Sequence, residues 1–253
     1  MVQICALASG SNGNCYYVGN REHAVLIDAG ISRRQVLERM RKRGLDPSKI
    51  MGIFISHEHS DHACGIRVLS QKLSVPVFMT RITYKNSREQ HRPDQYHAFT
   101  PGESIQVGNL TVHTFSKLHD AAEPCSFVVE YDHTKVGVMT DIGSPCDNVK
   151  SHVPDCDAIF LESNYDEKML WSGPYPQYLK VRVAGQRGHL SNDQAVQLIA
   201  EHASERLRYI CLSHLSAENN LPQLALESFK DLAHKHRVVL TDRYAAANVI
   251  ELP

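Results

Sequence analysis

The chain has 253 residues, enough to bury a substantial core in one large domain or two small ones. Its 27 Lys and Arg residues nearly balance its 28 Asp and Glu residues, so bulk charge indicates neither a nucleic-acid nor a membrane partner. The first residues lack a secretion signal, and no segment is apolar enough to span a bilayer, which favours a cytoplasmic protein. Seven cysteines without C-x-x-C spacing argue against a disulfide framework.

Short apolar segments rich in β-branched residues predict strands along the whole chain, at 2–7, 24–27, 50–55, 110–115, 127–131, 136–139, 158–161, 209–212 and 238–240. Helical patterns are clearest at 32–43, 192–203 and 222–234. Ser191 and Gln194 form a capping-box pattern, and Pro222 suits a first helical turn. Runs of strands with interspersed helices predict an α/β fold of helix-covered sheets, which we expect to form one domain over residues 1–253. The most loop-like stretch is 163–188.

A weak internal repeat links two predicted strands. Residues 25–30 (Val-Leu-Ile-Asp-Ala-Gly) resemble residues 138–143 (Val-Met-Thr-Asp-Ile-Gly), and in each case a following strand ends at polar residues. Two related halves that face each other would explain the repeat, while chance similarity over so short a stretch is the alternative.

The strongest local signal is the sequence His-Glu-His-Ser-Asp-His at residues 57–62, directly after the strand predicted at 50–55. On an extended backbone His57 and His59 point to the same side, whereas Asp61 and His62 follow a bend and can address a second ion. Imidazole nitrogens and carboxylate oxygens suit zinc, and also manganese or iron. A histidine-rich surface loop is the alternative, but four candidate ligands in six residues favour a metal site.

This pattern, H-x-H-x-D-H, matches the signature of the metallo-β-lactamase superfamily, which the chain resembles over nearly its whole length. The resemblance implies an αβ/βα four-layer sandwich of two related halves that holds two divalent metal ions, with zinc favoured, at one edge of its sheets. It also implies the ligands: His57, His59 and His119 on one ion, Asp61, His62 and His214 on the other, and Asp141 between the two.

His189 is left over from this ligand set. By resemblance to the nuclease branch, it would lie near the scissile phosphate, oriented or protonated through Glu162, and would stabilise the departing oxygen or donate a proton to it. Asp61 would orient the attacking hydroxide, which two metal ions share and which is the nucleophile. The alternative is that His189 merely precedes the helix cap at Ser191. A leaving-group residue favours phosphodiester hydrolysis over thioester or lactone hydrolysis.

Residues 7–15, 162–166 and 213–220 resemble a bacterial group of the superfamily called YycJ or WalJ, whose members have been regarded as DNA exonucleases. The resemblance implies a phosphodiesterase that degrades DNA from an end. The Gly- and Asn-rich segment 9–14 could offer N–H groups to a phosphate, or could be only a tight turn. Segment 163–188 combines side chains that could follow a single strand, or could simply pack on the domain: Tyr165, Trp171, Tyr175, Tyr178, Lys168, Lys180, Arg182 and Arg187.

Several alternatives are narrowed by the same residues. The stretch from Asp141 to His214 has no room for the large inserted domain of ribonuclease J, which disfavours RNA processing of that kind. Substrate contacts must then come from this domain, its loops or a second subunit, so a homodimer stays open. Zinc β-lactamases carry other residue types at the position of Asp141, so this aspartate disfavours that activity. Inactive members of the superfamily usually lose one or more ligands, so the full ligand set disfavours an inactive metal-binding protein. The alternative function is a hydrolase of thioesters, lactones or cyclic nucleotides.

Overall fold

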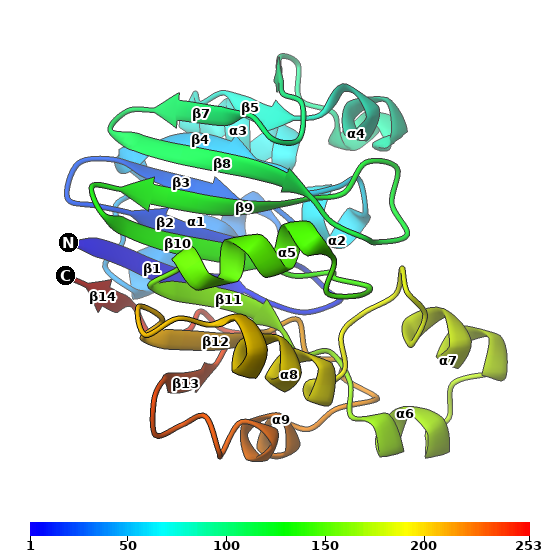
Figure 1. The fold of residues 1–253 in the computed structure, drawn as a ribbon. Helices are drawn as coiled ribbons and strands as arrows, with labels where there is room; N and C mark the ends of the chain where they lie inside the picture. Colours follow the sequence, from blue (N-terminus) through cyan, green and yellow to red (C-terminus); the bar gives the residue numbers. More distant parts are fainter.

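The computed structural model describes residues 1–253 as two seven-stranded sheets that pack face to face (Figure 1). The first sheet has the order β14-β1-β2-β3-β4-β5-β6 and the second the order β13-β12-β11-β10-β9-β8-β7. The strands of the first sheet are β1 (Val2–Ala8), β2 (Cys15–Gly19), β3 (Ala24–Ile27), β4 (Ile50–Phe54), β5 (Val77–Met79), β6 (His97–Ala98) and β14 (Ile250–Leu252). Those of the second are β7 (Ser104–Val107), β8 (Leu110–Ser116), β9 (Cys125–Tyr131), β10 (Thr134–Met139), β11 (Ala158–Glu162), β12 (Tyr209–Ser213) and β13 (Arg237–Leu240).

Helices cover the outer face of each sheet. The first half contributes α1 (Arg33–Lys42), α2 (Ser60–Ala63), α3 (Ile66–Leu73) and α4 (Arg81–Asn86); the second contributes α5 (Asp147–His152), α6 (Glu167–Ser172), α7 (Gln177–Val183), α8 (Asn192–His202) and α9 (Pro222–Ser228). Short 3₁₀ turns lie at Pro47–Lys49, Glu89–His91 and Val153–Asp155. In Figure 1, α5 and α8 lie in front of the second sheet, and α2, α6 and α7 all lie toward the right-hand edge of the sandwich.

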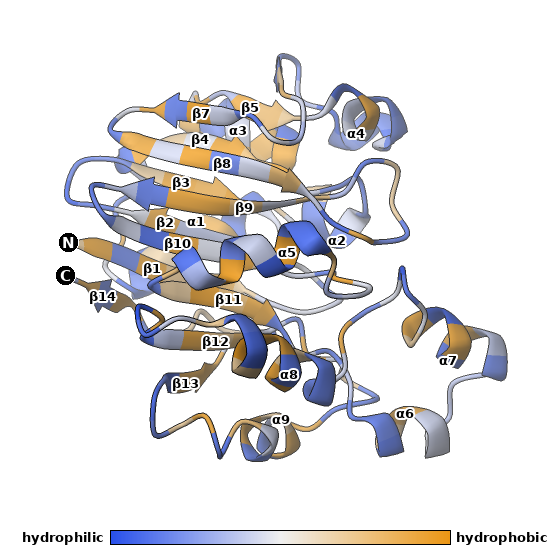
Figure 2. Ribbon diagram, in the orientation of Figure 1, coloured by the Kyte–Doolittle hydropathy of each residue, from blue (hydrophilic) through white to orange (hydrophobic).

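Three apolar clusters separate four layers. One lies between the sheets and contains Phe54 and Phe127, one from each sheet. A second packs α1 and α3 against the first sheet through Val36, Met40 and Leu69, and a third packs α5, α8 and α9 against the second sheet. Figure 2 shows the corresponding pattern, with apolar strands inside and polar helix surfaces outside. The predicted αβ/βα sandwich is therefore confirmed.

The two halves repeat the same local topology. In the first sheet β3 pairs antiparallel with β2 and parallel with β4, and in the second sheet β10 pairs antiparallel with β9 and parallel with β11. An aspartate with a positive φ follows the end of β3 and of β10, with φ of 62° at Asp28 and 52° at Asp141. Aspartate tolerates this conformation better than most residues. The short repeat in the sequence is thus matched by equivalent positions in the fold.

The predicted elements are found close to their expected bounds, with two differences. Segment 163–188, expected to be loop-like, contains α6 and α7. The last predicted helix ends at Ser228 rather than His234, because the chain then continues in tighter turns, with Lys230 N–H bonded to Glu227 and Leu232 N–H bonded to Phe229. None of the helices combines the length and the hydropathy that a membrane-spanning segment requires.

Candidate metal centre

The predicted ligands come from separate strand ends that meet at one edge of the sandwich. His57 and His59 follow β4, Asp141 follows β10 and His214 follows β12, while His119 lies in the connection between β8 and β9. The strands β10, β11 and β12 are parallel neighbours, so their carboxyl ends share one edge. The fold thereby brings together residues that are far apart in sequence.

The first group of ligands is a cluster of three histidines. Suitable nitrogen atoms of His57, His59 and His119 all lie within 4.8 Å of one another. The Nε2 of His57 and the Nδ1 of His59 are 3.0 Å apart. His119 donates from Nδ1 to the carbonyl oxygen of Gly188 at 3.0 Å, which leaves its Nε2 free to bind an ion. This geometry can hold one divalent cation.

The second group contains Asp61, His62 and His214, whose candidate ligand atoms also lie within 4.8 Å of one another. Each of its imidazoles is oriented by a buried carboxylate. His62 Nδ1 donates to Asp28 Oδ2 at 2.7 Å, and His214 Nδ1 donates to Glu162 Oε1 at 3.0 Å. A carboxylate on one ring nitrogen fixes the tautomer that presents the other nitrogen to an ion. This group can therefore hold a second cation.

Asp141 lies between the two groups. Its Oδ2 is 3.2 Å from His62 Nε2, and its Oδ1 is 3.5 Å from His214 Nε2 and 3.8 Å from His119 Nε2. Asp141 Oδ2 and His214 Nε2 are buried and have no hydrogen-bond partner. Leaving buried polar atoms without partners is costly, and a cation between them would satisfy both. The residues present thus fit a pair of divalent ions that share Asp141.

The electrostatics of the site favour ionised carboxylates. Burial would raise the pKa of Asp141, but the facing imidazoles of His214 and His62 outweigh it and hold that pKa well below its usual range. Burial would also raise the pKa of Glu162, yet the contact with His189 brings it to about 2. In the same way, burial would lower the pKa of His214, but Asp141 and neighbouring carboxylates raise it to about 10. Protons and divalent cations therefore compete for this site.

His189, which the resemblance to the nuclease branch places near the scissile phosphate, lies beside the two clusters. Its Nδ1 donates to Glu162 Oε1 at 2.8 Å, and its side chain is 22% exposed. Glu162 is itself fixed, because its Oε2 accepts the N–H groups of Ile142 at 2.7 Å and Leu190 at 3.1 Å. One buried carboxylate therefore orients both His189 and His214, a dual contact that the sequence did not reveal.

A recess of about 150 Å³ opens next to His189, between the metal centre and α7. Ser11, Tyr175 and Leu179 contribute to its lining. Arg182 also lines it and donates from Nε to Asp120 at 2.6 Å. Asp120 is the residue that follows the candidate ligand His119 in the sequence. This recess, which is lined by the Arg182–Asp120 ion pair, by His189 and by Tyr175, can receive part of a substrate beside the candidate ligands.

Segment 163–188, for which the sequence left open binding of a single strand or simple packing on the domain, contains both buried and exposed side chains. Tyr165 is 1% exposed and Lys180 is 8% exposed, with the Lys180 ammonium donating to the Trp171 carbonyl at 2.8 Å. These two side chains stabilise the segment and are not available to a strand. Trp171 and Tyr178 are exposed, at 44% and 75%. Burial, which composition does not reveal, separates the two groups.

The Gly- and Asn-rich segment 9–14 forms a tight turn against the loop of residues 57–62, called the metal loop below. Gly13 N–H bonds the Gly10 carbonyl at 2.9 Å, and Asn14 N–H donates to the Asp61 carbonyl at 2.7 Å. Asn14 thereby holds Asp61 in place, as Asp28 holds the ring of His62. Sequence reasoning assigned neither of these positioning roles. The repeat could have identified Asp28, because it places that aspartate at the position equivalent to Asp141.

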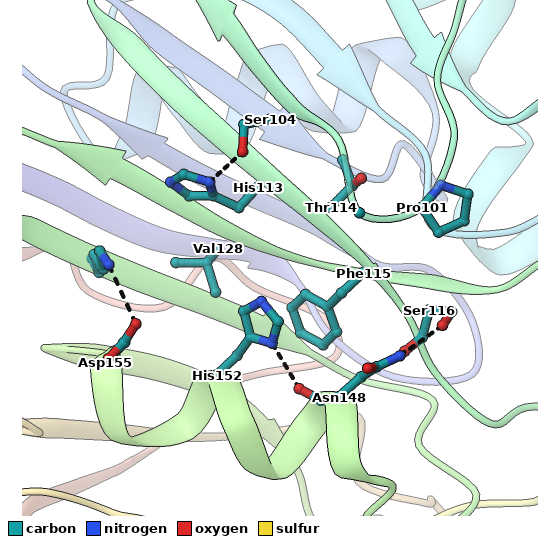
Figure 3. A pocket seen from close by; sticks show the side chains of 12 residues that line it. Pro101, Ser104, His113, Thr114, Phe115, Ser116, Val128, Asn148, His152 and Asp155 are labelled. Carbon is teal, nitrogen blue, oxygen red and sulfur yellow. Dashed lines mark hydrogen bonds and ion pairs between the residues drawn. The ribbon is translucent and has the colours of Figure 1, made fainter.

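A separate depression of about 430 Å³ lies on the outer face of the second sheet, beside α5 (Figure 3). Ser104 and His113 form a 2.7 Å hydrogen bond there, and His113 also contacts Glu130 at 2.7 Å. None of its lining residues belongs to the candidate metal centre, so this depression is not the proposed catalytic site.

Comparison with known proteins agrees with this geometry. Residues 23–211 match the family model described as a beta-lactamase superfamily domain. The chain belongs to the beta-lactamase superfamily. Membership confirms the family that the signature at residues 57–62 indicated.

Two relatives within the superfamily carry the name exodeoxyribonuclease. The chain is 36% identical over 228 residues to exodeoxyribonuclease YycJ of Bacillus anthracis, covering 88% of this chain and 86% of that one. It is 33% identical over 224 residues to exodeoxyribonuclease WalJ of Streptococcus pneumoniae, covering 87% and 83%. The metallo-beta-lactamase fold protein YhfI from Bacillus subtilis matches with a TM-score of 0.76 over 99% of this chain and 100% of that one. At 16% identity, this last likeness concerns the fold alone.

Proposed function

We propose that the chain is a two-metal phosphodiesterase that degrades DNA from an end. The observation that carries the proposal is the pair of ligand clusters sharing Asp141, with His189 held beside them by Glu162 at 2.8 Å. The names of the two relatives support DNA as the substrate class. A thioester or lactone hydrolase would have less need of a residue placed to assist a departing oxygen.

We infer that zinc is the favoured ion, because nitrogen-rich sites with a few carboxylates suit it, with manganese or iron as substitutes. His57, His59 and His119 would hold one ion, Asp61, His62 and His214 the other, and Asp141 both. When bound, two such ions lower the pKa of a shared water and supply a nucleophile near neutral pH. The seven cysteines are all free, which supports the reducing cytoplasm as the location.

The residues of the chain itself position the reactants. Asp28 and Glu162 fix the rings of His62 and His214. Asp61, whose side chain is more exposed than that of Asp141, would orient the water. As the water oxygen bonds to phosphorus, the bond from phosphorus to the leaving oxygen breaks. His189, whose Nδ1 lies 2.8 Å from Glu162 Oε1, would then pass a proton to that oxygen.

The test uses purified protein loaded with zinc or manganese and DNA labelled at either end, both single- and double-stranded. We expect release of mononucleotides, abolished in His59→Ala and Asp141→Ala. His189→Ala should lower the rate by about 10²–10⁴-fold while metal content stays unchanged. Intact DNA with both metals verified in the protein would refute the proposal. So would rapid hydrolysis of thioesters or lactones that oligonucleotides do not inhibit.

A further inference from the structure

A concentration of positive charge lies outside the proposed catalytic centre, on α1. Residues 33–43 contain six basic residues and one acidic residue, although the chain as a whole is nearly balanced at 27 against 28. A local excess of this kind creates a positive potential that the net charge of the molecule conceals.

Half of these basic residues already have partners. Arg39 donates to the carbonyls of Leu7 and Tyr244, Arg43 donates to Ala246, and Lys42 pairs with Glu38 at 2.8 Å. The remaining three, Arg33, Arg34 and Arg41, are exposed and have no side-chain hydrogen bond or ion pair. Their charges do not serve the fold and are free to meet a ligand.

The three arginines join Lys72 of α3 along one groove. Arg33, Arg34, Arg41 and Lys72 line an open groove of about 610 Å³ together with Leu37 and Glu38. Glu38 is its only acidic residue, and Lys42 already compensates it. Arginine guanidinium groups suit phosphate oxygens because they can donate two parallel hydrogen bonds. The groove therefore fits a chain of phosphate groups.

The turns that precede the two helices of this groove contact each other beside His62. Ala29 N–H bonds the His62 carbonyl at 2.8 Å, and Gly65 N–H bonds the Ala29 carbonyl at 2.8 Å. From this junction the chain enters α1 at Arg33 and α3 at Ile66, and both helices then run back along the outer face of the first sheet. At 1.5 Å per residue, Arg33 and Arg41 are separated by about 12 Å, the length of roughly three phosphate spacings on one strand of a duplex.

We propose that the α1–α3 groove, formed by Arg33, Arg34, Arg41 and Lys72, binds the phosphate backbone of the DNA that extends away from the scissile bond. This inference rests on the proposed function and adds to it a second contact region that contains none of the candidate ligands. Contacts of this kind are independent of sequence and weaken as salt rises, because each one releases counterions. They would favour long substrates over fragments that reach only the metal centre.

The test compares a charge reversal in the groove with a matched reversal elsewhere. Arg34→Glu/Lys72→Glu removes two groove contacts. Arg21→Glu/Lys235→Glu makes the same change in net charge at exposed residues that have no side-chain partner and lie outside the groove. Metal content and thermal stability should match the wild type in both variants. The substrates are a 30-nucleotide DNA, single-stranded or duplex, and a dinucleotide.

We expect the groove variant to lose about tenfold or more in kcat/KM on the long DNA at moderate salt, with cleavage of the dinucleotide unchanged. Its plot of log(kcat/KM) against log salt should become shallower by roughly 1.4 to 1.8, the contribution of two phosphate contacts. The control variant should stay within about twofold of the wild type on both substrates. Equal behaviour of the two variants, or a parallel loss on the dinucleotide, would overturn the proposal.

A binding experiment separates this inference from the proposed function. In the His59→Ala background, binding of fluorescent 30-nucleotide DNA should weaken with the groove reversal and not with the control. That result would support the groove even if the wild-type protein cleaved no DNA. Equal binding by the two variants would refute the groove, whatever the nuclease assay shows.

Discussion

At the scale of single residues, the candidate metal centre contains two carboxylates, Asp28 and Glu162, that hold imidazole rings in place. Asp28 is fully buried and accepts hydrogen bonds from Ser56 N–H at 2.8 Å and from His62 Nδ1 at 2.7 Å. These hydrogen bonds fix the loop that contains residues 57–62. A side chain of this kind determines the direction of a ligand and its basicity.

We predict that Asp28→Asn weakens binding of the second metal ion by about 10- to 100-fold, because the amide keeps the shape of the side chain but loses its charge. Metal titration followed by elemental analysis measures this effect. Asp94→Asn, at an exposed position whose side chain contacts Arg67 and Gln71 and no candidate ligand, is the control and should bind metal normally. Unaltered affinity in Asp28→Asn would show that the orientation of His62 does not depend on this carboxylate.

At the scale of elements, the metal loop is held by close backbone contact between two turns. A Cβ added at Gly30 would lie 1.5 Å from the Asp61 carbonyl oxygen, which leaves no room for any side chain. The turn after β3 therefore presses directly on the start of α2. Only glycine permits this approach.

We predict that Gly30→Ala displaces Asp61 and His62 and reduces metal occupancy at the second group of ligands. Gly44→Ala is the matched control, because nothing lies within 4 Å of a Cβ there and only its positive φ of 68° opposes the change. The control should cost about 1 kcal/mol of stability and leave metal binding intact. If Gly30→Ala bound both ions as tightly as the control, the close contact would not position the loop.

Elements also show which features of the structure are legible in the sequence. The candidate ligands at 57–62 are contiguous and follow an apolar strand, so the local sequence indicates a metal site there. His119, Asp141 and His214 are far apart in sequence, and only the resemblance to the superfamily indicated them. The helices α5, α6 and α7 were missed because each is short and buries a single residue, which leaves no helical periodicity to detect. Tyr165 is buried and Tyr178 is exposed because of tertiary packing, which cannot be predicted from local composition.

At the scale of the whole molecule, the candidate ligands come from both sheets. His57, His59, Asp61 and His62 come from the first half, and His119, Asp141 and His214 come from the second. Ions bound here would cross-link the halves and would bind the native state but not the unfolded chain. Such binding stabilises a protein by mass action.

We predict that a chelator lowers the melting temperature of the metal-loaded protein. At free metal equal to 100 times the dissociation constant, the bound ions contribute about 2.7 kcal/mol per site. For a chain of this size that corresponds to roughly 5–10 °C per site. Calorimetric melts with and without chelator measure the shift, and restored metal should reverse it. Identical melting curves would mean that the ions do not cross-link the halves.

The pairing of Asp28 with Asp141 has a consequence for how such a centre is built. The two residues occupy equivalent positions and share the same unusual backbone conformation, yet one supports an imidazole while the other lies between both ligand groups. A fold made of two matching halves contains two such positions, and the residue at each can have a different function. Asymmetric chemistry can therefore arise from a symmetric framework without any change in the course of the chain.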